Sequence, residues 1–249
     1  MAQAFLRFYQ ELNEFLPPEK QKREFSVEFN PPVSVKHVIE SQNIPHTEVD
    51  LILVNSDPVD FQYLLQPGDR VSVYPMFESV DISAYSPLRQ SPLRNPKFIA
   101  DVHLGKLARL LRLCGFDTEY NNYLDDKEIA DLSVKEKRAI LTRDRGLLKR
   151  KKVNRGYCVR SQNADKQLRE VFERFDLFAS AKPFSRCISC NSILERADND
   201  DVVCPECGEA KKWYTEFWKC TGCGKIFWKG PHYWDMIRRL KGILPELNL

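Results

Sequence analysis

The sequence contains no long apolar run. None of its 249 residues belong to a stretch approaching the ~20 consecutive apolar residues that a membrane-spanning helix needs. The start of the chain also lacks the pattern of a signal peptide. We therefore expect a cytoplasmic protein without a membrane partner. Hydrophobic residues make up 43% of the chain and charged residues 29%, a composition that builds cores and argues against wholesale disorder.

Basic residues are scarce in the first 80 residues of the chain. Residues 1–80 hold 6 Lys/Arg and 12 Asp/Glu, a net charge of −6. Residues 81–249 hold 32 Lys/Arg and 23 Asp/Glu, a net charge of +9. An acidic front joined to a basic rear predicts separate modules, of which the basic one prefers polyanions.

Residues 1–78 have the pattern of a small α+β domain. Strict alternation over residues 24–29 predicts a strand, and Ser34 is placed to cap a short helix. Apolar runs at 51–54 and 71–73 predict two further strands. The order of two strands, a helix and two strands resembles a ubiquitin-like β-grasp domain of the sulfur-carrier type. Sulfur carriers end in Gly-Gly, which is missing here, so we expect this domain to bind a protein partner instead.

Residues 79–96 read as a proline-rich linker, after which strands and helices alternate over residues 97–180. Short apolar strands are predicted at 98–100 and 139–142, with helices between and after them. This alternation predicts an α/β domain with a parallel sheet.

Three aspartates lie where such a sheet binds ligands. Asp101 and Asp144 each follow a predicted strand, and Asp126 is expected to cap the helix between them. The carboxyl ends of parallel strands share one edge of the sheet, where clustered carboxylates need a cation between them. Oxygen ligands favour Mg²⁺ or Mn²⁺, which can activate water against a phosphodiester. Taken singly, each aspartate is better explained as a helix cap or a turn residue, and only the three together make a metal site an equally good explanation.

A basic segment begins beside Asp144. Residues 143–155 contain seven Lys/Arg and one acid, which would suit an RNA backbone, although such runs are often only solvated surface. The cations predicted to bind RNA come from this segment and from the helix after Asp101: Lys106, Arg109, Arg112, Arg143, Arg145, Lys149, Arg150, Lys151 and Lys152.

Six of the eight cysteines form three Cys-x-x-Cys pairs: Cys187/Cys190, Cys204/Cys207 and Cys220/Cys223. Disulfide frameworks are typical of short secreted chains, so we interpret these pairs as metal-binding thiolates in a module spanning residues 181–249. A structural zinc takes four thiolates, which leaves one pair over. The aromatic residues of this module are expected to be mainly core, and any exposed ones could stack on unpaired bases: Trp213, Tyr214, Phe217, Trp218, Phe227, Trp228, Tyr233 and Trp234.

Three segments of the chain resemble the Mut-seven C-terminal RNase family: residues 98–112, residues 141–148 and residues 224–233, which read Gly-Lys-Ile-Phe-Trp-Lys-Gly-Pro-His-Tyr. The resemblance implies a PIN-like nuclease domain with a C-terminal zinc ribbon, preceded in some members by a ubiquitin-like domain. It also implies that Asp101, Asp126 and Asp144 hold the catalytic metal.

The family pattern keeps the first and last cysteine pairs, which implies one zinc bound by Cys187, Cys190, Cys220 and Cys223. Cys204 and Cys207 depart from this pattern. They leave open a spare dithiol, a different choice of four ligands, or a second metal completed by His232.

We therefore expect a Mg²⁺- or Mn²⁺-dependent ribonuclease, endonucleolytic in action, whose partner is RNA such as tRNA or rRNA. The alternative is a non-catalytic RNA- or ribosome-binding protein that uses the basic segment and the ribbon. Substitution of Asp144 separates the two, because only the enzyme would lose a cleavage activity.

Overall fold

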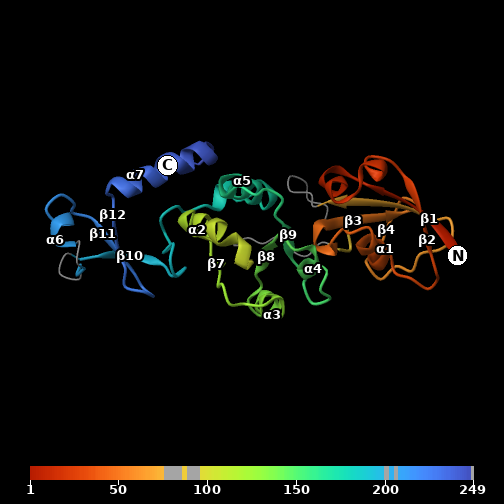
Figure 1. The fold of residues 1–249 in the computed structure, drawn as a ribbon, viewed down its shortest axis with the longest axis horizontal. Helices are drawn as coiled ribbons and strands as arrows, with labels where there is room; N and C mark the ends of the chain where they lie inside the picture. Colours follow the sequence, from red (N-terminus) through yellow and green to blue (C-terminus); the bar gives the residue numbers. More distant parts are fainter. Residues whose placement is uncertain (76–85, 89–95, 199–201, 205–206, 248–249) are drawn as a thin grey trace. The chain divides into compact units, whose positions relative to one another are not determined.

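The computed structural model describes residues 1–75, 86–88, 96–198, 202–204 and 207–247. The chain divides into two compact units (Figure 1). The first consists of residues 1–94 and 125–158, and the second of residues 95–124 and 159–249. In the described part of the chain, no helix has the length and apolar character needed to cross a membrane.

The first unit contains a five-stranded sheet in the order β2-β1-β5-β3-β4. Its elements are β1 (Ala2–Phe8), β2 (Phe25–Phe29), α1 (Val35–Ser41), β3 (Val49–Val54), β4 (Asp57–Pro58) and β5 (Arg70–Pro75). The central strands β1 and β5 run parallel, whereas the other neighbours are antiparallel. Two strands, a helix and the remaining strands, in this order, form the predicted ubiquitin-like domain.

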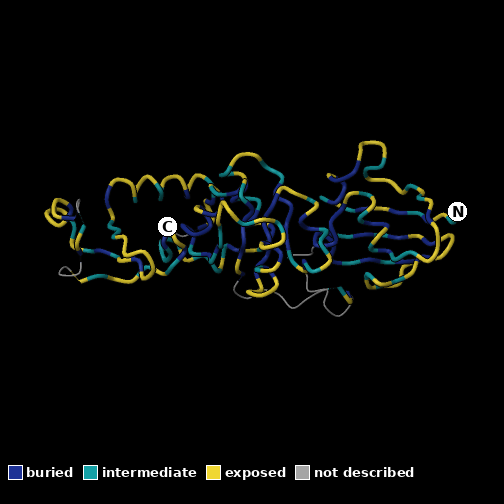
Figure 2. The backbone as a smooth tube through the Cα atoms, turned by 60° about the horizontal axis from the view of Figure 1, so that its bottom comes forward, coloured by how far each residue is buried: buried dark blue, intermediate teal, exposed yellow. Residues whose placement is uncertain are grey.

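Alternation and capping explain why these residues form a β-grasp. Along β1, Ala4, Leu6 and Phe8 are buried, whereas the residues between them are not. Buried segments of the backbone are dark blue in Figure 2. Ser34 caps α1 as predicted, because its hydroxyl accepts a hydrogen bond from the backbone N–H of His37.

The first unit also contains α3 (Asp126–Glu136), β8 (Ala139–Thr142), α4 (Arg145–Leu148) and β9 (Gly156–Cys158). Strands β8 and β9 are parallel, with Ile140 opposite Gly156. Close packing explains why residue 156 is a glycine, since a Cβ at this position would collide with the Leu148 side chain. The N-cap of α3 is Asp125, which forms a capping box with Glu128, so the prediction that Asp126 is the cap is wrong by one residue.

The second unit contains β6 (Phe98–Ala100), α2 (Gly105–Leu113), β7 (Thr118–Glu119) and α5 (Ala164–Arg174). Strands β6 and β7 are parallel, and α2 packs against α5. With the parallel pair β8 and β9, this confirms the prediction of parallel sheet structure between the two flanking modules.

The rest of the second unit forms the ribbon module. Its three-stranded antiparallel sheet, in the order β10-β11-β12, consists of β10 (Leu194–Ala197), β11 (Phe217–Cys220) and β12 (Ile226–Trp228). Two helices accompany it, α6 (Cys207–Ala210) and α7 (Pro231–Ile243). Single 3-10 turns occur at Gln10–Phe15, Pro18–Lys20, His46–Glu48, Val102–Leu104 and Phe178–Ser180.

Candidate metal centre and nuclease residues

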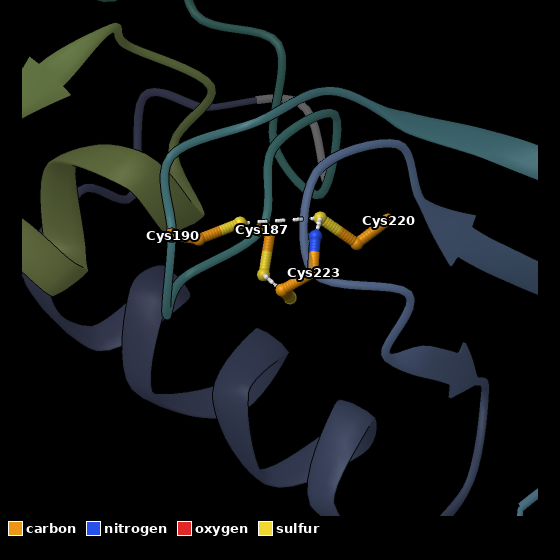
Figure 3. Close-up of side chains that lie close together, drawn as sticks. All are labelled: Cys187, Cys190, Cys220 and Cys223. Carbon is orange, nitrogen blue, oxygen red and sulfur yellow. Dashed lines mark hydrogen bonds between the residues drawn. The ribbon is translucent and has the colours of Figure 1, made fainter.

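Four cysteine sulfur atoms converge in the ribbon module. The Sγ atoms of Cys187, Cys190, Cys220 and Cys223 all lie within 4.8 Å of one another (Figure 3). Cys187 Sγ lies 3.7 Å from Cys223 Sγ, and Cys190 Sγ lies 3.2 Å from Cys220 Sγ. A tetrahedral zinc with Zn–S bonds of about 2.3 Å separates its sulfurs by about 3.8 Å, so the arrangement fits this ion.

Turns supply the local geometry of this cluster. Each Cys-x-x-Cys pair folds back on itself, and the backbone N–H of Cys223 donates to Cys220 Sγ at 3.4 Å. Burial raises the pKa of Cys190, but hydrogen bonds from Ser192 and from neighbouring thiols outweigh it and bring this pKa to about 6. Burial and the other thiols raise the pKa of Cys223 to about 12. A bound dication would stabilise four thiolates held this close together.

The remaining pair of the ribbon does not join this cluster. Cys204 and Cys207 form a disulfide with each other. They are therefore the pair left over, oxidised to a disulfide, and not the metal ligands that the spacing left open. Their side chains lie at a small core made by Val202, Ala210 and Phe217.

Two of the three predicted acids lie in the first unit. Asp144 is exposed and caps α4, since its Oδ1 accepts the N–H of Gly146 at 2.7 Å. Asp126 opens α3 and is half-buried, and its Oδ2 lies 3.2 Å from Arg150 Nη2. Both carboxylates retain oxygen atoms for further ligands, so each is able to contribute to a cation site.

The third acid, Asp101, belongs to the second unit. It follows β6, as predicted, and is buried with 6% of its surface exposed. Its Oδ1 accepts the N–H of Val102 at 2.6 Å, at the start of the turn that leads into α2. A carboxylate that follows a parallel strand in this way suits a metal ligand. The convergence of the three acids on one ion stays a prediction.

The cations of the basic segment fall into two groups. Arg143 and Lys151 are exposed. The others contact the protein. Arg150 pairs with Asp126 and Lys152 with Asp131.

Two further cations of this segment contact the ubiquitin-like domain. Lys149 donates to Glu40 O at 2.9 Å and to Asn43 Oδ1 at 3.0 Å. The guanidinium of Arg145 lies 4.8 Å from the centre of the Phe15 ring. Part of the basic segment therefore holds the ubiquitin-like domain, which its composition alone does not indicate.

The cations of α2 are also divided. Lys106 and Arg109 are exposed, as expected for residues that meet RNA. Arg112 is only 4% exposed, so the prediction that it is displayed to RNA is wrong. Its Nε donates to Thr118 O at 2.8 Å and its Nη1 to Ser189 O at 2.9 Å. The buried guanidinium ties α2 to the first cysteine turn, and burial lowers its pKa.

The sequence did not predict that residues of the ubiquitin-like domain contact β9 and the loop before it. His46 Nε2 lies 2.8 Å from Val153 O, and the carboxylate of Glu48 accepts the backbone N–H of Cys158 at 2.6 Å. Glu48 is 1% exposed. Glu48 stands among His46, Thr47 and Asp50 in the sequence, so no local pattern marks its carboxylate as buried.

Two family models match the chain. One, described as the Mut7-C RNAse domain, matches residues 96–240, and the other, described as Mut7-C ubiquitin, matches residues 1–81. No curated protein and no solved structure matches. The order of the two matches agrees with the β-grasp at the front of the chain and with the parallel strands and cysteine cluster behind it. The chain belongs to the Mut7-C RNAse domain family and carries the ubiquitin-like domain of that family at its front.

Proposed function

We propose that this chain is a Mg²⁺- or Mn²⁺-dependent endoribonuclease. The observation that carries the proposal is the match to the RNAse domain family together with two acids, Asp101 and Asp144, placed just after parallel strands. In this proposal Asp101, Asp126 and Asp144 hold the ion. When bound, the ion would activate water and neutralise charge that develops on the phosphate.

The side chains around these acids have separate roles in the proposal. Arg143 and Lys151 are exposed and hold the RNA backbone, as do Lys106 and Arg109 on α2. Arg150 Nη2 lies 3.2 Å from Asp126 Oδ2, so in this proposal it orients this carboxylate before a metal binds. His103 is exposed but has no assigned role, because metal-bound water needs no separate base.

The test is cleavage of mixed RNA substrates with Mn²⁺ or Mg²⁺, compared with the double variant Asp101→Asn/Asp144→Asn. Asn suits both positions, since its side-chain oxygen can still accept the N–H of Val102 or Gly146 while the charge is lost. Cleavage that requires the ion and disappears in the folded variant would support the proposal. Salt-sensitive binding without cleavage in the wild type would instead favour the RNA-binding alternative.

We also propose that the four-cysteine cluster binds one structural zinc. The support is the mutual placement of the four sulfurs, which matches a closed tetrahedral site without room for substrate. Elemental analysis should find one zinc per chain. Cys220→Ser should lose it, whereas Cys204→Ala/Cys207→Ala should retain it, and retention in Cys220→Ser would contradict this ligand set.

A further inference from the structure

The ribbon sheet has two faces of different character. On one face, Phe217 lies between its cross-strand neighbours Ala197 and Trp228, and these side chains pack in the core with Val202 and Ala210. Because side chains alternate along a strand, the neighbouring residues of each strand point to the opposite face. The second face therefore carries the residues that adjoin Ala197, Phe217 and Trp228 in the sequence.

The second face carries a row of one cation and two aromatic rings. Arg196 lies opposite Trp218 on the adjacent strand, and Trp218 lies opposite Phe227 on the next. Directly opposed residues share a face with their Cβ atoms about 5 Å apart. Trp218 and Phe227 are partly exposed and are not among the residues of the ribbon core. Packing in the core explains why positions 217 and 228 carry aromatic rings. It does not explain the rings of Trp218 and Phe227.

Cations border the aromatic pair. Lys229 Nζ lies 5.3 Å from the centre of the Trp218 ring, and the Arg196 side chain is 73% exposed. Both cations share one counter-ion, Glu216, at 3.2 Å from Lys229 and 3.7 Å from Arg196. Exposed ion pairs of this kind contribute little to stability, so an incoming phosphate can replace Glu216 as their partner.

We propose that Trp218 and Phe227 form a stacking platform for the unpaired bases of single-stranded RNA, and that Arg196 and Lys229 bind its phosphates. Aromatic rings on adjacent strands of an open sheet are an arrangement on which two successive bases can stack. The charge of the flanking side chains favours RNA over an apolar protein surface. This inference rests on the proposed function, because it assigns the single-stranded class of RNA to the same enzyme.

The test is the affinity of the full chain for a labelled oligouridylate and for an RNA duplex, by fluorescence anisotropy without added Mg²⁺ or Mn²⁺. Trp218→Ala and Phe227→Ala should each weaken single-strand binding by about 5- to 100-fold, the range for loss of one stacked base. Duplex binding should change little. Trp218→Phe should restore most of the affinity, because the ring face is kept.

The charged residues give a separate signature. Lys229→Ala should reduce the slope of log affinity against log salt by about 0.7, since one phosphate contact is lost. Trp218→Ala should leave this slope unchanged. Glu216→Gln should strengthen single-strand binding, because Arg196 and Lys229 lose their competing partner.

Trp213 is the matched control. It is a tryptophan of the same module with 80% of its surface exposed and lies outside the aromatic row, so Trp213→Ala should bind as the wild type does. Thermal unfolding checks each variant, and Trp218→Leu replaces Trp218→Ala if the alanine variant does not fold. Leu fills the space without offering a ring face.

The proposal is overturned if folded Trp218→Leu and Phe227→Ala bind the single strand as the wild type does, or if Trp213→Ala loses as much. That result would leave the face to a protein partner. If the wild-type chain cleaves RNA but these variants bind the single strand normally, the stacking platform is refuted and the proposed nuclease activity is not. If the wild-type chain does not cleave RNA but the variants lose single-strand binding, the proposed nuclease activity is refuted and the stacking platform is supported.

Discussion

Lys149 donates a hydrogen bond of 2.9 Å to the backbone carbonyl of Glu40, the next-to-last residue of α1. The Glu40 carbonyl also accepts the backbone N–H of Asn43 at 3.0 Å, so Lys149 is a second donor to it, and the lysine charge complements the dipole at this end of the helix. The basic segment and the ubiquitin-like domain are thus in direct contact within the first unit. The basic segment therefore contains two kinds of cation: those that contact the ubiquitin-like domain, such as Lys149, and exposed ones that are free to bind RNA, such as Lys151.

Replacement of Lys149 should affect stability more than RNA binding. Lys149→Met removes two hydrogen bonds to Glu40 and Asn43, and we expect it to lower the free energy of unfolding by about 1 kcal/mol. Lys151→Met, its exposed neighbour, should leave stability unchanged and reduce the salt slope of single-strand RNA binding by about 0.7. Urea unfolding and salt titrations measure both effects. A larger loss of salt slope in Lys149→Met than in Lys151→Met would contradict this division.

Removal of the Glu48 carboxylate should destabilise the first unit. Glu48→Ala leaves the buried N–H of Cys158 without this acceptor, at an expected cost of about 1–3 kcal/mol in the free energy of unfolding. Glu48→Gln keeps an acceptor oxygen and should lose less. Thermal or urea unfolding of the two variants checks the prediction, which fails if Glu48→Ala is as stable as the wild type.

The stability of the first unit should fall in acid because His46 is held in its neutral form. Burial, followed by the nearby charge of Lys36, lowers the pKa of His46 below its ordinary value of 6.5, and Glu40 opposes these effects only in part. The unfolded chain therefore binds a proton more readily than the folded chain. Stability from this group is complete above pH 6.5 and is lost as the pH falls through the lowered folded pKa.

A series of urea unfolding curves between neutral and mildly acidic pH measures this dependence. His46→Gln retains a donor for Val153 O and cannot titrate, so the part of the pH dependence due to His46 should disappear in this variant. An identical pH dependence in the two proteins would refute the role of His46.

Thiol reactivity should distinguish the cysteines of the chain. Burial raises the pKa of Cys114 to about 12, so its thiol should resist alkylation in the folded protein. Cys190 is exposed and has a pKa of about 6, so it should react first once a chelator has removed the metal. Cys204 and Cys207 should react only after reduction. Mass spectrometry of alkylated peptides checks this order, and rapid labelling of Cys114 in the native state would contradict it.

Periodicity predicts the elements whose apolar stripe is regular. The stripe of Leu107, Ala108 and Leu111 gives α2, and the run over residues 139–142 gives β8. Strand β9 reads Gly-Tyr-Cys and lacks the apolar run that marks the equally short β6, and α7 mixes aromatic and charged residues without a regular apolar stripe. Both elements were therefore missed.

The candidate site is predicted less completely for a physical reason. Spacing identifies the cysteine turns, but it does not show that Cys204 and Cys207 bond to each other. Composition identifies a basic segment, but not which cations face protein. Arg112 is buried because the carbonyls of Thr118 and Ser189 satisfy its guanidinium, and Ser189 lies 77 residues away in the sequence. Local sequence carries no record of such partners.

The contacts of His46 and Glu48 also set an order of events during synthesis. The β-grasp sheet closes when β5 joins β1, so its strands are complete once residue 75 has left the ribosome. Val153 and Cys158 lie 107 and 110 residues beyond their partners, and are translated much later. In the nascent chain, the Glu48 carboxylate therefore stays hydrated on an already formed domain. Its dehydration waits for β9, which makes this burial a late step in the maturation of the first unit.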